Sequence, residues 1–250
     1  SVKLKKSIFS YLDRIFDKKI SPNVNFYNFT KGGFSEKDIA EILYDYLLEK
    51  DIKSFDNKER DLFFNEKTIS ALLSDKNDKE KIFKVFEKYN NQVDIESFVF
   101  AILPKLNYNL SLFIGIEGII DVNYLHKNNV DYLIYYALNN NVSSSDSFKK
   151  FFYYFFGNPD YFKKYNQLLT KYFYRLDKSL QLFLINKTDY IDYFSEYGLS
   201  GLLEKISDAK IVKEIIKKAN IFENFNYDEL IHFYDKIDDK YKKLIFKDEV

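Results

Sequence analysis

The chain has 250 residues, and its 38 lysine and arginine residues balance 38 aspartate and glutamate residues, giving a formal charge of zero. Cysteine, methionine and tryptophan are absent, which excludes a disulfide scaffold, a zinc finger, an iron–sulfur protein and a thiol nucleophile. A hydrophobic fraction of 46% is too high for an intrinsically disordered chain, and 7 glycines with 3 prolines are too few for a low-complexity segment.

Lysine supplies nearly all of the positive charge, because arginine occurs only at Arg14, Arg60 and Arg175. Together with abundant Asn, Ile, Phe and Tyr, this lysine-rich composition is typical of an A+T-rich genome. It disfavours functions that need many bidentate arginine contacts. Since the sequence starts at Ser1 and holds no methionine, we expect it to be a processed or excerpted part of a longer product.

The dominant pattern in the first half is helical, with apolar residues recurring every three or four positions. It predicts helices over residues 4–15, 36–47, 59–73, 80–89 and 94–103. Ser35 resembles a helix cap, and Pro104 ends the last of these helices. Strand signals are few: residues 23–29 alternate weakly, and residues 112–116 are apolar enough for a short buried strand.

The second half is denser in helical signals. Helices are expected over residues 131–138 and 146–156, and from Pro159 onward, where a capping Asn158 precedes the proline. Further starts are predicted at Thr188-Asp189, Ser207-Asp208 and Asn226, and Gly198 and Gly201 are expected to flank short turns. The polar run 139–145 is the clearest linker.

These elements predict an all-α fold, built as a multi-helix array of antiparallel helix pairs. The array is either an irregular, solenoid-like helical repeat or a large bundle, because the segments share no fixed period. The linker suggests an N-terminal part, 1–138, and a C-terminal part, 146–250, although one continuous domain is also open. No stretch is long and apolar enough for a transmembrane segment, since 110–120 is interrupted by Ser111 and Glu117.

Signals for catalysis, metals or cofactors are weak. The two histidines, His126 and His232, are far apart in the sequence and are best explained as packed or surface residues. Residues 81–103 resemble a helix–loop–helix unit but lack the acidic run and the glycine of a calcium loop. We therefore predict no catalytic residue, metal site or cofactor, and an enzyme would require a pocket that the linear sequence hides.

The most informative region is 148–178, where seven cations face only two acids among thirteen aromatic residues. The candidate polyanion-binding residues are Lys149, Lys150, Lys163, Lys164, Lys171, Arg175 and Lys178. The last four would form one cationic stripe if they lay on a single helix. Two interpretations of this region remain. It is a binding surface for phosphates with rings available for base stacking, or its lysines are the solvent-exposed face of an amphipathic helix whose rings form the core.

The 22 tyrosines and 26 phenylalanines exceed what a core obviously needs, so some tyrosines are expected on the surface. Tyr132, Tyr135 and Tyr136 cannot all point inward from one helix, which makes them candidate protein-contact residues. The predicted function is a non-enzymatic scaffold or adaptor whose partner is another protein. A nucleic-acid-binding subunit that uses the basic region 148–178 is the alternative.

Overall fold

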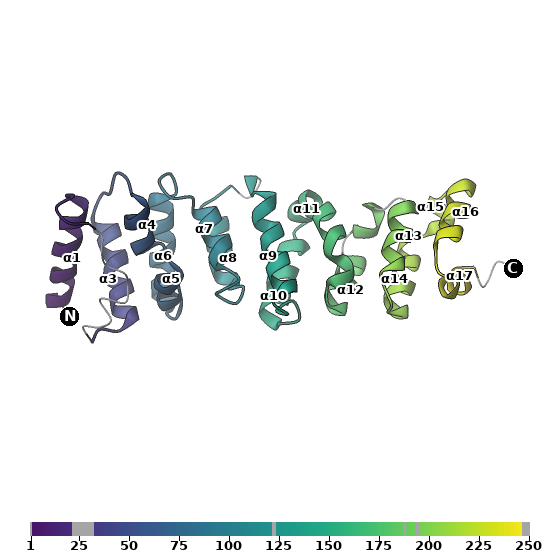
Figure 1. Cartoon of the computed structure of the whole chain (residues 1–250), viewed down its shortest axis with the longest axis horizontal. Coiled ribbons are helices and arrows are strands. Elements are labelled where there is room, and N and C mark those ends of the chain that lie inside the picture. Colours follow the sequence, from purple (N-terminus) through teal and green to yellow (C-terminus); the bar gives the residue numbers. More distant parts are fainter. Residues whose placement is uncertain (1, 22–32, 122–123, 188, 194–195, 247–250) are drawn as a thin grey trace. The chain divides into compact units, whose positions relative to one another are not determined.

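A computed structural model describes residues 2–21, 33–121, 124–187, 189–193 and 196–246 (Figure 1). Every regular element in these ranges is a helix and none is a strand, which confirms the all-α class. The contacts group the residues into a first unit, Ser1–Leu133, and a second unit, Ile134–Val250. This boundary falls inside α9 (Lys127–Asn139), whereas we expected a linker over 139–145; the division into 1–138 and 146–250 stays a prediction.

The first unit is built from short helices that bury one apolar stripe each. In sequence order they are α1 (Val2–Phe16), α3 (Glu36–Glu49), α4 (Asn57–Phe63), α5 (Glu66–Leu73), α6 (Lys76–Tyr89), α7 (Ile95–Ile102), α8 (Leu110–Glu117) and the first part of α9. The helix α3 packs against α1, α4, α5 and α6, while α8 packs against α6 and α7. Aromatic rings join neighbouring helices: the rings of Tyr46 on α3 and Phe63 on α4 are stacked with centroids 6.3 Å apart.

The second unit is also built from short helices. Its elements after α9 are α10 (Asp146–Gly157), α11 (Pro159–Tyr172), the 3₁₀-helix η2 (Phe173–Arg175), α12 (Lys178–Lys187), the 3₁₀-helix η3 (Tyr190–Tyr193), α13 (Glu196–Glu204), α14 (Ala209–Ala219), α15 (Ile221–Asn224), α16 (Tyr227–Lys236) and α17 (Asp239–Ile245). The helix α10 packs against α11 and α12, α12 packs against α14, and α13 packs against α16. The phenylalanine-rich face of α10 is buried, and α10 packs against α11 and α12.

Side-chain caps begin most of the helices where the sequence predicted a start. The Ser35 hydroxyl accepts a hydrogen bond from the Asp38 backbone N–H at 3.1 Å. Asn158 accepts from the Asp160 N–H at 2.9 Å, with Pro159 in the first turn, and Asn226 forms a reciprocal capping box with Glu229. Such a cap satisfies an N–H group that the helix itself leaves without an acceptor.

Three local predictions were wrong. The helix expected over 59–73 is two helices, because the Asn65 side-chain oxygen caps α5 by accepting from the Thr68 N–H at 3.0 Å. Residues 112–116 lie in α8, where Asn109 supplies the cap at the Leu112 N–H. Gly198 and Gly201 lie within α13 rather than beside short turns. The weak strand signal at 23–29 lies outside the described residues.

One buried tyrosine in the first unit carries a hydroxyl with no hydrogen-bond partner. Tyr44 is fully buried, and its hydroxyl makes no hydrogen bond to any described residue. Burial raises the pKa of Tyr44 above its ordinary value of 10.0. An unsatisfied buried hydroxyl costs about 1 kcal/mol or more. We therefore expect Tyr44→Phe to raise the free energy of unfolding by about 1 kcal/mol in urea titrations.

Tyr89 provides the matched control for this substitution. Its hydroxyl lies 2.8 Å from the Leu47 carbonyl oxygen and 2.9 Å from that of Lys50. Removing this donor in Tyr89→Phe should lower the free energy of unfolding by about 1 kcal/mol. A loss of stability in Tyr44→Phe as large as that in Tyr89→Phe would contradict the assignment of an unsatisfied hydroxyl.

Candidate functional site

The basic region does not form the single helical stripe that the sequence predicted. Lys164 and Lys171 lie on α11, but α11 ends at Tyr172, Arg175 belongs to η2, and Lys178 begins α12. The interruption has a local cause. Leu176 is extended, and Asp177 accepts a hydrogen bond from the Ser179 N–H at 2.8 Å, so the sequence starts a new helix there.

Several of these cations are engaged by groups of the second unit. Lys149 Nζ lies 3.2 Å from Asp177 Oδ1, and Lys178 Nζ lies 2.7 Å from Asp208 Oδ2. An Arg175 Nη2 donor lies 2.7 Å from the Asn139 side-chain oxygen. The bond from Lys178 is the largest cause that holds the pKa of Asp208 below its ordinary value. Burial alone would raise the pKa of Asp177, but its bonds to Ser179 and the Lys149 charge outweigh it and lower that pKa.

The remaining cations of this region are exposed, while most of its rings are not. Lys150 lies on α10 and Lys163 on α11, both exposed to solvent. Lys164 and Lys171 lie over the rings of the adjacent residues Tyr165 and Tyr172, at 5.4 and 4.8 Å from the centroids. Most of the rings are core residues: Phe148, Phe151, Phe152, Phe155, Phe156, Tyr161, Phe162, Tyr165, Tyr172 and Phe173 are buried. Buried rings offer no faces for base stacking.

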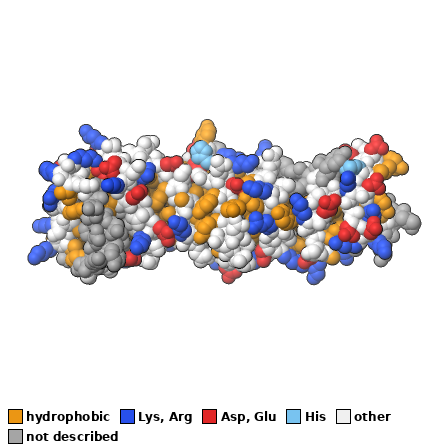
Figure 2. Space-filling model, in the orientation of Figure 1, with side chains coloured by type: hydrophobic (Ala, Val, Ile, Leu, Met, Phe, Trp, Pro, Cys, Tyr) orange, Lys and Arg blue, Asp and Glu red, His pale blue; other side chains and the backbone are white. Residues whose placement is uncertain are grey.

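The three candidate tyrosines lie on α9, Tyr132 in the part that belongs to the first unit and Tyr135 and Tyr136 in the part that belongs to the second. Tyr132 is 40% exposed and Tyr135 is 51% exposed, while Tyr136 is half-buried. Residues three and four positions apart share a helix face, so the spacing of these rings is set by α9 itself. Figure 2 shows hydrophobic side chains exposed between lysine and acidic side chains on the visible face of each unit. The role of Tyr132, Tyr135 and Tyr136 as protein contacts stays a prediction.

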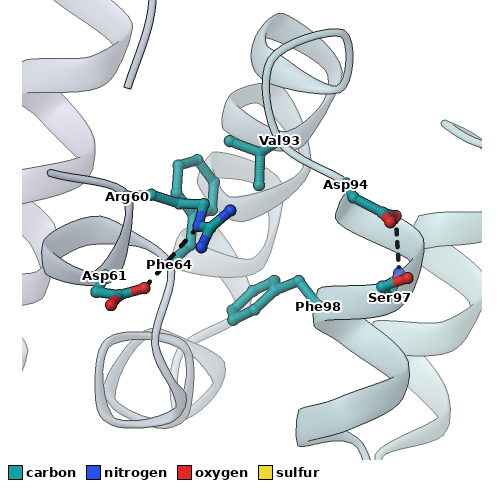
Figure 3. A pocket seen from close by; sticks show the side chains of 7 residues that line it. All are labelled: Arg60, Asp61, Phe64, Val93, Asp94, Ser97 and Phe98. Atoms are coloured by element: carbon teal, nitrogen blue, oxygen red, sulfur yellow. Dashed lines mark hydrogen bonds and ion pairs between the residues drawn. The ribbon is translucent and has the colours of Figure 1, made fainter. Parts of the chain in front are cut away.

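The structure also shows a pocket that the sequence analysis missed. It lies in the first unit, between α4 and the turn that leads into α7, and has a volume of about 370 Å³. Its lining residues are Arg60, Asp61, Phe64, Val93, Asp94, Ser97 and Phe98. Figure 3 shows the Arg60 guanidinium beside the Phe64 ring, with the Phe98 ring on the side of α7.

The wall of this pocket is apolar and well packed. Phe64 and Val93 are buried, and Phe98 is half-buried. The Phe64 and Phe98 rings are nearly perpendicular, with centroids 6.0 Å apart, and both rings also contact Phe86 of α6. This packing fixes the position of the wall, because each ring is held by the other two.

The polar groups of the pocket are carried at its rim. The Arg60 Nε atom lies 3.9 Å from Asp61 Oδ1, and this ion pair is exposed, with relative side-chain exposures of 45% and 74%. The guanidinium makes no hydrogen bond to any residue in the described part of the protein. Asp94 caps α7 by accepting from the Ser97 N–H at 3.0 Å. The arrangement provides a planar cation above an aromatic wall.

Neither histidine belongs to a group of metal-ligating side chains in the described part of the chain. The His126 backbone N–H donates to Glu96 Oε1 at 2.7 Å, and His232 lies half-buried on α16. Within the described ranges, no group of His, Asp and Glu side chains is arranged to hold a metal ion. In the same ranges, no helix combines the length and the apolarity that a bilayer span requires.

Comparison of the sequence and structure with models of known protein families, with curated proteins and with solved structures finds no match. The functional conclusions therefore depend on the geometry of the surfaces described above.

Proposed function

We propose that the protein is a non-enzymatic helical scaffold that binds another protein through exposed aromatic side chains. The observation that carries this proposal is the exposure of Tyr132 and Tyr135, three positions apart on α9. Tyrosine presents a large, rigid ring with a polar tip, which is why it is enriched at the centres of protein interfaces. Each tyrosine has only two rotatable side-chain angles, so ordering its ring on binding costs little conformational entropy.

The helix contacts support an irregular array of antiparallel helix pairs as the scaffold. In the first unit α3 packs on α5, and α6 packs on α8; in the second unit α10 packs on α12, and α12 packs on α14. Contact of a helix with the next helix but one is typical of stacked helical pairs. Such stacking presents successive helix faces to a partner, which suits an adaptor.

Nucleic-acid binding through the basic region 148–178 is the alternative, and the contacts of that region favour it less. Lys149 and Lys178 are paired with Asp177 and Asp208 of the same unit. A phosphate would have to compete with these carboxylates for the two lysines.

Selection from a phage-displayed library of random peptides tests the proposed function. We expect the protein to enrich aromatic-containing peptides that bind with micromolar affinity. The double variant Tyr132→Ser/Tyr135→Ser should bind the selected peptides at least about tenfold more weakly, since loss of an anchoring ring typically costs more than 1 kcal/mol.

The exposed residue Tyr154 of α10 provides the matched control. The variant Tyr154→Ser removes a ring of the same kind and should keep full affinity for the selected peptides. A selection that enriches no peptide, or peptides that bind the double variant as well as the unchanged protein, would refute the proposed function.

A further inference from the structure

We propose that the pocket around Arg60 binds the C-terminal carboxylate of a peptide whose last side chain is apolar. This inference rests on the proposed function, because it gives the chemistry of a peptide group that the scaffold would hold. It concerns a different surface from the α9 tyrosines, so the two can be tested separately.

The first argument is the state of the Arg60 side chain. Its contact with Asp61 is 3.9 Å long and involves Nε only, and no described residue accepts a hydrogen bond from the guanidinium. An exposed ion pair of this length contributes little stability. The two terminal nitrogens are therefore available for the parallel, bidentate hydrogen bonds that a carboxylate accepts from arginine.

The second argument is the wall that lies beside this cation. The buried Phe64 and Val93 and the half-buried Phe98 form the apolar side of an open pocket of about 370 Å³, which lies within the size range of small ligand sites. Figure 3 shows the Arg60 guanidinium beside the Phe64 ring, with the Phe98 ring next along the same wall. An apolar side chain placed there would cover the rings while its neighbouring carboxylate meets Arg60.

The third argument is the charge of the rim, which opposes a doubly charged anion more strongly than a singly charged one. The carboxylate of Asp94 caps α7, so the positive end of the helix dipole offsets part of its charge. Asp61 is largely exposed, and water screens its charge. The two acids still oppose a doubly charged group such as a phosphate, and they can accept hydrogen bonds from N–H groups of a peptide. The C-terminal carboxylate of a peptide fits this pattern best.

Amide chemical shifts of the ¹⁵N-labelled 250-residue protein test the inference with two small probes, N-acetyl-phenylalanine and N-acetyl-phenylalaninamide. The probes share the ring and the acetyl group and differ in the charge of one end. We expect the acid to shift the amides of Ser97 and Phe98 and to bind at least about tenfold more tightly than the amide. Equal affinities of the two probes, or shifts only at residues elsewhere, would overturn the inference without any variant.

Variants then assign the preference to Arg60. Arg60→Gln should abolish the preference for the acid, and Arg60→Lys should weaken it, because an ammonium group has no planar fork. Arg14→Gln makes the same charge change on an arginine of α1 and should leave the preference unchanged. A preference that survives Arg60→Gln, or tighter binding of phenyl phosphate than of the acid, would also overturn the inference. The proposed function is judged by the peptide selection on α9, whatever the probes do here.

Discussion

Replacing Phe155 by alanine is expected to lower the free energy of unfolding by about 3–5 kcal/mol. The Phe155 side chain of α10 is fully buried. Its ring stacks on Tyr161 with centroids 4.6 Å apart, and it also meets Phe151 at 5.8 Å and Tyr165 at 5.7 Å. The substitution removes a buried ring and leaves a cavity that the surrounding aromatic rings are too rigid to fill. Urea denaturation followed by circular dichroism measures the loss.

Tyr154→Ala is the control for this prediction. Tyr154 is the preceding residue on the same helix, but its ring is 39% exposed. Truncating a partly exposed ring removes less buried area, and alanine is the better helix former. We expect Tyr154→Ala to change the free energy of unfolding by less than about 1 kcal/mol. Similar losses for the two substitutions would show that Phe155 is not part of a tightly packed core.

Gly115→Ala is expected to lower the free energy of unfolding by about 1–3 kcal/mol, although alanine favours the helix. Gly115 lies in α8, where a Cβ atom would come within 1.9 Å of Phe83 Cε1 and 2.0 Å of Phe83 Cζ on the neighbouring helix α6. These distances are far below a van der Waals contact, so the ring or the helix must move. The strain should exceed the gain of about 1 kcal/mol from helix propensity.

Gly201→Ala and the second-site substitution Phe83→Ala separate the gain in helix propensity from the steric strain. A Cβ atom at Gly201 in α13 meets no side chain of a described residue within 4 Å, so this variant should gain about 0.5–1 kcal/mol in stability. Adding Phe83→Ala to Gly115→Ala should make the two effects non-additive, because the ring that clashes is gone. Strictly additive effects of the two substitutions would exclude the clash as the cause.

The helix starts were predictable because their signals are local. Ser35, Asn158, Asp208 and Asn226 each accept a backbone hydrogen bond within three residues, as their sequence context predicted. Side-chain capping also explains why the helix expected over 59–73 was wrong. The apolar period places Asn65 inside one long helix, whereas its side-chain oxygen caps a second helix, and both arrangements fit that period.

The candidate sites were less predictable, because they depend on contacts between helices. The expected stripe from Lys164 to Lys178 required one straight helix, and the cap at Asp177 starts a new helix within it. The pocket combines Arg60 and Phe64 near α4 with Phe98 of α7, and no local pattern relates these positions. The scarcity of arginine in a lysine-rich sequence marks Arg60 only together with Arg14 and Arg175.

The central claim is that exposed rings on α9 form a protein-binding surface, and backbone amide shifts on addition of a selected peptide test it most directly. We predict that the largest shifts fall on residues adjoining Tyr132 and Tyr135 and disappear in Tyr132→Ser/Tyr135→Ser. Shifts of full size in that double variant, or shifts confined to the basic region 148–178, would contradict the claim.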